Sequence, residues 1–237
     1  MALPKLGYPT FELELPSTGK TIKYRPFLVK EEKVLLMALE SKDEKQVVSA
    51  VKDLIKNCVI TRIKVDNLPS FDLEYLFLKI RGASIGENII LTVTCLDDNE
   101  TQVEANININ DVEIFKPEGH DKKIMFDENT GLVMKYPSMK EFVDREFLQK
   151  EMKTEDVYDF IADSIDQIFD SEEVYDSSTT TKKEFRTFVD SLTTKQFEKI
   201  QKFYETSPKL SHTFKVTNPK TNKESSYTIE GLQSFFA

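Results

Sequence analysis

The stretch Tyr24-Arg-Pro-Phe-Leu-Val-Lys-Glu-Glu-Lys-Val-Leu-Leu-Met-Ala-Leu-Glu40 decides the fold, because it changes from an extended segment to a helix. Arg25 is biased toward an extended conformation, since the ring of Pro26 clashes with a helical predecessor. Glu31 and Glu32 then fall in the first helical turn, where carboxylates complement the helix dipole. Six consecutive apolar residues follow at 34–39, and they cover more than half of the helix circumference at about 100° per residue. We therefore expect this helix to be buried on most sides.

Further elements flank this helix on both sides. Apolar and polar residues alternate before and after the turn at 16–19, which predicts a β-hairpin over residues 10–25. Apolar residues at helical spacing between 47 and 58 predict a second helix, with Cys58 on its buried side. A third helix is expected from Ser70, as its N-cap, to Gly82, as its end. We expect the three helices to form one layer.

The rest of the chain divides into a β-rich middle, a helical region and a closing hairpin. Hairpins are predicted for three pairs of segments: 87–95 with 101–109, 124–126 with 132–136, and 210–217 with 224–229. Helices are predicted from four groups of apolar residues, at 138–150, 154–169, 185–192 and 194–207. The sequence therefore predicts an α+β fold, in which β-hairpins pack with the N-terminal helical layer and a helical subdomain is inserted. The expected domains are the α+β core at 1–137, the helical subdomain at 138–207, and a C-terminal hairpin with an apolar tail at 208–237 that returns to the core.

Composition narrows the functional classes. The chain has 237 residues, of which 39% are apolar, so it is long enough to bury a core. No run approaches the roughly 18 to 20 apolar residues that cross a bilayer, and the N-terminus lacks the apolar segment of a signal peptide. We therefore expect no membrane partner and a cytosolic place of synthesis. The net charge of −9, with 41 acidic and 32 basic side chains mixed along the chain, argues against nucleic acid as a partner.

Side chains with chemical potential are few. His120 lies in a polar loop and His212 near a strand start, and neither is beside a cysteine or at metal-ligand spacing. The turn at 97–100 follows Cys95 and has the outline of a zinc knuckle that lacks its second thiol. It is either a solvated hairpin tip or a weak cation site. The turn at 218–221 has the same outline without a thiol, so neither turn can hold zinc. We expect no catalytic residue, no metal and no cofactor.

Several stretches resemble the baseplate hub protein family of T-even-type contractile-tailed bacteriophages, especially its cyanophage-like members. The matching stretches run from end to end, with the region around 140–190 the least similar. They are Met1-Ala-Leu-Pro-Lys-Leu6, Pro16-Ser-Thr-Gly-Lys20, Ile22-Lys-Tyr-Arg-Pro-Phe-Leu-Val-Lys-Glu-Glu-Lys33, Phe71-Asp-Leu-Glu-Tyr-Leu-Phe-Leu-Lys-Ile-Arg-Gly-Ala-Ser-Ile-Gly-Glu87, Thr94-Cys-Leu-Asp-Asp-Asn-Glu100, Leu132-Val-Met-Lys-Tyr-Pro137, Pro208-Lys-Leu210, Val216-Thr-Asn-Pro-Lys-Thr221 and Glu230-Gly-Leu232.

The resemblance implies a non-enzymatic role in building the virion. The expected function is that of a central hub subunit of the tail baseplate, acting in hub assembly. The alternative is a transient assembly chaperone that is absent from the mature virion. The expected partners are other phage baseplate hub proteins, and the expected locations are the virion tail baseplate and, during assembly, the host cytoplasm. A cell-wall hydrolase would need a carboxylate pair in an apolar cleft, and no acidic residue stands alone in an apolar run.

Candidate protein-contact residues lie near both ends of the chain. Phe235 and Phe236 are adjacent and close to a free end, so they dock either on the chain's own core or on a neighbouring subunit. Tyr24, Arg25 and Phe27, where the first hairpin meets the helix, are expected to contribute to the same contact surface.

Overall fold

We describe residues 6–138 and 154–231 of a computed structural model of the chain. These residues form two compact units, one made of 6–115 with 209–231 and the other of Lys116–Pro208. They contain six α-helices and eleven strands, and the strands lie in small antiparallel sheets. The predicted α+β class is therefore confirmed. The boundaries of the three expected domains stay a prediction.

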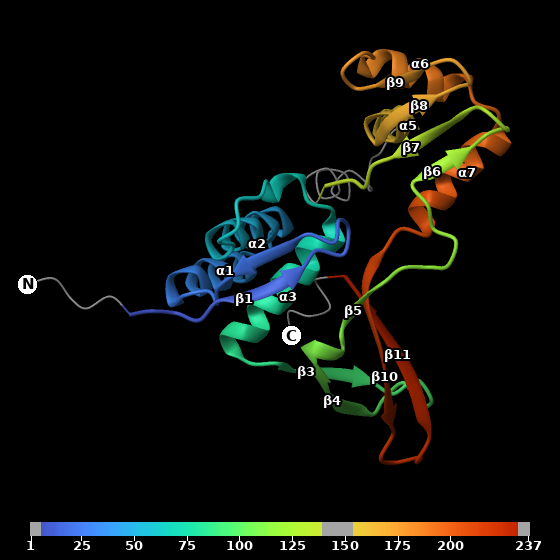
Figure 1. Cartoon of the computed structure of the whole chain (residues 1–237). Helices are drawn as coiled ribbons and strands as arrows, with labels where there is room; N and C mark the ends of the chain where they lie inside the picture. The colour runs from blue at the N-terminus through green and yellow to red at the C-terminus, as the bar shows by residue number, and fades with distance from the viewer. Residues whose placement is uncertain (1–5, 139–153, 232–237) are drawn as a thin grey trace, which may run out of the picture. The chain divides into compact units, whose positions relative to one another are not determined.

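The first unit begins with the expected hairpin and its helical layer. Strands β1 (Phe11–Glu14) and β2 (Thr21–Tyr24) pair antiparallel. They lie beside α1 (Val29–Ser41), α2 (Glu44–Cys58) and α3 (Ser70–Ile85), as Figure 1 shows. A short 3-10 turn, η1 (Val65–Asn67), precedes α3. The hairpin turn is tied to α3, because the Ser17 backbone N–H donates to the fully buried Asp72 carboxylate at 3.0 Å.

The two expected ends of the third helix were wrong. Ser70 is the first helical residue and not the cap, and the helix continues past Gly82 to Ile85. A Cβ at Gly82 would lie 3.6 Å from the Ile109 side chain, which is an ordinary van der Waals distance, so packing does not require glycine there. Gly86 is the C-cap of the helix, and its φ of +115° is strained for other residues.

A second group of strands completes the first unit. The predicted hairpin is formed by β3 (Asn88–Thr94) and β4 (Gln102–Asn108), and the 3-10 turn η2 (Ile109–Asp111) follows it. Strand β10 (Lys209–Thr217) lies between β11 (Glu224–Glu230) and β5 (Glu113–Phe115), a strand that the sequence did not predict. Lys209 pairs with Phe115. The chain thus leaves for the second unit and returns from it on neighbouring strands.

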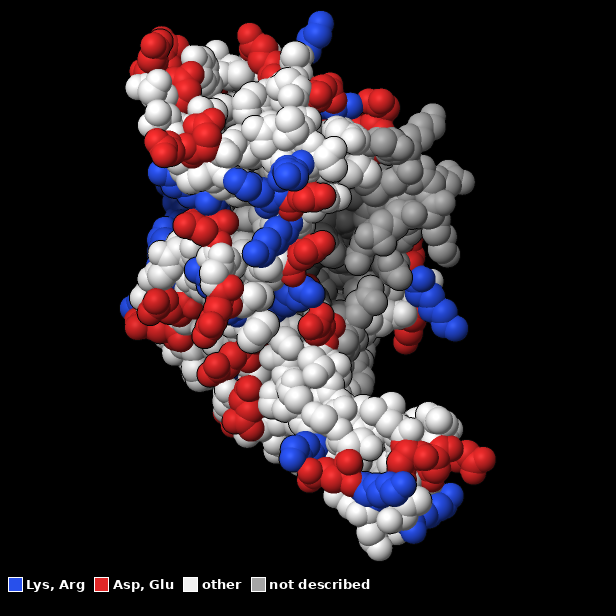
Figure 2. Space-filling view, turned by 90° about the vertical axis from the view of Figure 1, so that its right-hand side faces the viewer, with Lys and Arg blue, Asp and Glu red and all other residues white. Residues whose placement is uncertain are grey.

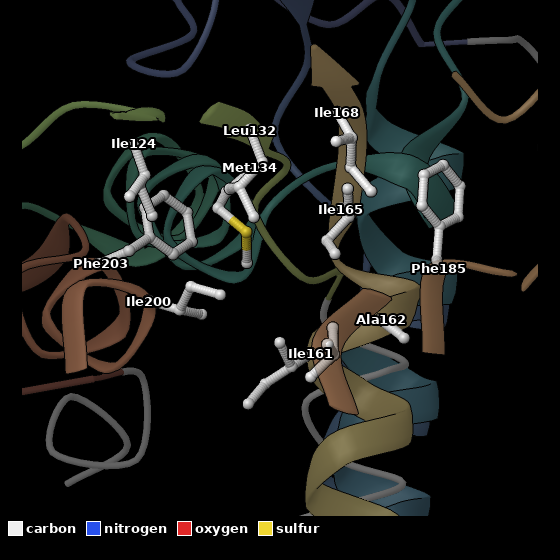
Figure 3. Packing of buried hydrophobic residues seen from close by; sticks show 11 residues of the cluster. Ile124, Leu132, Met134, Ile161, Ala162, Ile165, Ile168, Phe185, Ile200 and Phe203 are labelled. Atoms are coloured by element: carbon white, nitrogen blue, oxygen red, sulfur yellow. The ribbon is translucent and has the colours of Figure 1, made fainter. Parts of the chain in front are cut away.

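The second unit combines a four-stranded sheet with three helices. The sheet has the order β6 (Lys123–Met125), β7 (Gly131–Met134), β8 (Ile165–Phe169) and β9 (Val174–Asp176). The helices are α5 (Thr154–Asp163), α6 (Lys182–Ser191) and α7 (Thr194–Glu205). Apolar side chains from these elements point toward one another in Figure 3 and form the core of the unit.

One predicted helix of this unit was wrong beyond its first three turns. The apolar residues at 157–169 were expected in a single helix, but α5 stops at Asp163 and residues from Ile165 form β8. Ile165 and Ile168 are buried in the core through strand pairing with β7, a long-range contact that overrides the local helical spacing. The helix predicted at 138–150 lies almost wholly outside the described residues.

Candidate protein-binding surface

The start of α1 is fixed by a buried ion pair. The Arg25 Nη2 atom lies 3.1 Å from Glu31 Oε1, and the two side chains are only 9% and 3% exposed. The other carboxylate oxygen of Glu31 accepts the Leu28 backbone N–H at 2.7 Å, which caps the helix. Burial alone would raise the pKa of Glu31, but the hydrogen bonds from Arg25 and Leu28 and the positive charge of Arg25 outweigh it. The pKa of Glu31 is therefore lowered, and the carboxylate stays charged.

Backbone contacts hold the same segment against the ends of α2 and α3. The Arg25 N–H donates to the Cys58 carbonyl at 2.9 Å, and Tyr24 forms a β-bridge with Val59. The Phe27 N–H donates to Ser84 Oγ at 2.9 Å. The start of α1 is thus tied to both neighbouring helices, which sets the direction of the helix and the face that it exposes.

The expectation that α1 is buried on most sides was wrong. Leu35 and Ala38 face the interior of the unit together with Glu31. Val29, Leu36 and Met37 are 80%, 52% and 60% exposed. The apolar run is wider than the neighbouring layer can cover, because the side chains at 29, 33, 36, 37 and 40 share the opposite face of the helix.

We call the exposed face formed by Val29, Lys33, Leu36, Met37 and Glu40 the α1 surface. Leu36 and Met37 lie between Lys33 toward the N-terminus and Glu40 toward the C-terminus, and Val29 lies one turn before Lys33. The helix ends at Ser41, followed by Lys42 in the left-handed conformation at φ 55°. Clustered exposed apolar side chains of this kind on a folded unit are typical of protein-binding surfaces.

The predicted contact residues near the N-terminus lie beside this surface and not in it. Tyr24, Arg25 and Phe27 are 6%, 7% and 9% exposed. Their side chains are used within the first unit, where they position α1. Phe235 and Phe236 lie outside the described residues. The sequence did not single out the α1 surface, although the length of its apolar run was the one feature from which it could have been found.

The carboxylates of Asp97 and Asp98 in the acidic turn at 97–100 accept hydrogen bonds from the other turn, at 218–221. Asn218 Nδ2 donates to Asp97 Oδ1 at 2.9 Å and to Asp98 Oδ2 at 3.0 Å, and the Thr221 hydroxyl donates to Asp97. Hydrogen bonds from the Thr101 hydroxyl and backbone N–H hold the pKa of Asp98 well below its usual range. The two turns with similar outlines therefore clasp each other. Among the described residues, no group of three or more His, Cys, Asp and Glu side chains could hold a metal ion.

The side chain of His120 is fixed by hydrogen bonds within the second unit. His120 is buried, with Nδ1 2.9 Å from Thr206 Oγ1 and Nε2 2.8 Å from the Tyr136 hydroxyl. The Thr206 hydroxyl donates to the Lys202 carbonyl, so it accepts from Nδ1 and leaves Nε2 to accept from Tyr136. Burial lowers the pKa of His120, with smaller contributions from nearby lysines. The ring is thus held neutral.

Two further side chains with chemical potential, His212 and Cys58, lie in the first unit. His212 Nδ1 lies 3.1 Å from the Asp111 carbonyl, within the first unit. Burial raises the pKa of the Cys58 thiol to about 11, so the thiolate that reacts with electrophiles is scarce at neutral pH.

The charged side chains are acidic on balance, with a net charge of −9, but the two signs are mixed. Figure 2 shows basic and acidic side chains interleaved over the visible face. A nucleic-acid interface would gather lysine and arginine in one area. In residues 6–138 and 154–231, no helix combines the length and the apolar character that a membrane crossing requires.

Comparison with known proteins identifies a family. A family model described as T4 bacteriophage base plate protein matches residues 8–237, nearly the whole chain. No curated protein and no solved structure matches the chain significantly.

Proposed function

Since the chain belongs to the T4 bacteriophage base plate protein family, we propose that it is a non-enzymatic subunit of the central hub of the tail baseplate. It acts in hub assembly by binding other baseplate hub proteins, first in the host cytoplasm and then in the virion. Family membership gives the baseplate as its place of action. The hub position is the finer proposal, supported by the sequence resemblance to hub proteins.

The α1 surface is the observation that carries a binding role. A folded unit that leaves Val29, Leu36 and Met37 more than half exposed on one helix face gains free energy when a partner removes that face from water. Burial of apolar area stabilises a complex by roughly 25 cal/mol per Å² before the cost of association is subtracted. The rigid support from Arg25 and Glu31 favours binding further, because little order is lost when the partner docks.

Incorporation into the virion is tested by quantitative mass spectrometry of purified mature particles. A hub subunit gives peptides of this chain in a fixed ratio to other baseplate proteins. A transient chaperone gives peptides in assembling tails and none in mature particles. That second result would overturn the proposed structural role and favour the chaperone.

We propose the C-terminal pair Phe235 and Phe236 as a second contact, and the segment around Tyr24, Arg25 and Phe27 contributes by positioning α1, since its side chains are buried. A chain truncated after Glu230 should bind the other hub proteins more weakly in a co-purification experiment while it keeps its helical circular dichroism. Unchanged binding would remove this contact from the proposal. Loss of the helical signal would assign the two rings to the core.

A further inference from the structure

The α1 surface has a charge pattern that is complementary to itself. Lys33 lies three residues before Leu36, and Glu40 lies three residues after Met37. A twofold axis that passes between Leu36 and Met37 therefore places Lys33 of one antiparallel helix opposite Glu40 of the other. In a twofold interface each contact occurs twice, so this arrangement forms two ion pairs around a central apolar contact.

The alternative orientation of two such helices is unfavourable. A parallel pair would place Lys33 beside its own copy and Glu40 beside its own copy, and like charges at close range repel. Both side chains are exposed, and neither forms an ion pair within the described part of the chain. They are available to a second copy.

We propose that the α1 surface binds the α1 surface of a second copy of this chain, with the two helices antiparallel. This inference rests on the proposed function, because it identifies the partner of the α1 surface. Its test uses the purified chain alone, so it can fail independently of the hub role. One helix face from each copy is small beside the roughly 1,600 Å² that a standard interface buries. The dimer is therefore expected to be weak, reversible and dependent on concentration.

Sedimentation velocity of the full-length chain over a concentration series tests the proposal. The wild-type chain should shift from monomer to dimer as its concentration rises. Lys33→Glu and Glu40→Lys should each weaken the dimer by roughly 2- to 30-fold, because each loses two exposed ion pairs of modest strength. The double variant K33E/E40K restores opposite charges across the axis and should recover most of the affinity. Leu36→Asp should abolish the dimer.

Controls separate the interface from general effects. Lys223→Glu makes the same charge change on the exposed turn between β10 and β11 and should leave the dimer unchanged. Circular dichroism should show native helix content in every variant, since all the substituted side chains are exposed. Raising the salt concentration should weaken the wild-type dimer and have the opposite effect on the single charge variants.

A wild-type chain that stays monomeric throughout the series would overturn the proposal. A dimer that survives Leu36→Asp, or single variants that the double swap does not rescue, would also overturn it. A monomeric chain whose peptides are nevertheless stoichiometric in mature particles would leave the hub role intact and give the α1 surface to a different baseplate protein. A dimer that is absent from mature particles would leave this inference intact and remove the structural role.

Discussion

Replacing Glu31 with glutamine is expected to destabilise the first unit strongly, although the substitution keeps the size of the side chain. The Arg25 side chain is 9% exposed, and its guanidinium takes its counter-charge from Glu31 at 3.1 Å. The glutamine can still accept the Leu28 N–H, so the helix cap survives and the charge is the main loss. A buried charge without its partner costs about 3–5 kcal/mol. Glu32→Gln is the matched control, because it removes a charge from the same helical turn without breaking that pair and should cost about 0.3–1 kcal/mol.

Urea unfolding followed by far-UV circular dichroism measures the effect, and hydrogen exchange assigns it to a unit. Glu31→Gln should lower protection in α1 and in the end of α2, while residues 116–208 keep theirs. Arg25→Met combined with Glu31→Gln should cost less than the sum of the single changes, since no charge is then left buried alone. Equal stability of the Glu31→Gln and Glu32→Gln variants would refute the role assigned to the buried pair.

The same pair predicts a pH dependence with a definite sign. The pKa of Glu31 in the folded chain is lowered from its ordinary value of 4.5. Its stabilising contribution is therefore complete above that value and is lost as the pH falls through the lower, folded pKa. The stability difference between wild type and Glu31→Gln should accordingly be constant near neutral pH and shrink below about pH 4.5. A difference that grows on acidification would contradict this assignment.

Three further predictions concern the rest of the fold. Burial lowers the pKa of His120 in the folded chain below its ordinary value of 6.5, so the unfolded chain binds a proton at a higher pH than the folded chain does. The second unit should therefore lose up to about 1.4 kcal/mol of stability per pH unit below that value. His120→Phe should remove this pH dependence in thermal melts. Gly131→Ala should destabilise the second unit by about 1–3 kcal/mol, because a Cβ there would lie 2.5 Å from the Ile124 carbonyl oxygen, whereas Gly7→Ala meets no atom within 4 Å and should be neutral by calorimetry. Asn218→Ala should cost about 1–3 kcal/mol and increase hydrogen exchange at both clasped turns, and unchanged exchange at 95–101 would contradict the clasp.

Much of the fold follows from local pattern. The first hairpin, the helices of the first unit and the hairpins at 87–109 and 209–230 are all predicted from alternation, helical spacing and turn residues. The misassigned segment at 165–169 has helical spacing but enters a sheet, because its pairing partner β7 lies more than thirty residues earlier. Likewise Gly82 indicates a helix end in the sequence, but the helix continues to Ile85.

The binding surface was the harder part to predict. A run of six apolar residues indicates burial, and the sequence alone does not say whether the chain's own core or a partner supplies it. In the first unit the interior reaches Leu35 and Ala38 and leaves Leu36 and Met37 outside. The buried role of Arg25 was equally hidden, since arginine is seldom buried without a partner and that partner, Glu31, reads as an ordinary charge of a helix start.

Oxidative footprinting of Met37 tests most directly whether the α1 surface is a protein contact in the baseplate. The Met37 side chain is 60% exposed in the free chain, and an exposed thioether is readily oxidised to the sulfoxide. Its oxidation rate in purified baseplates should fall well below the rate in the dilute free chain, with peptides from the exposed β10–β11 turn as the internal reference. An equal rate in both samples, from baseplates that contain the chain, would contradict the account.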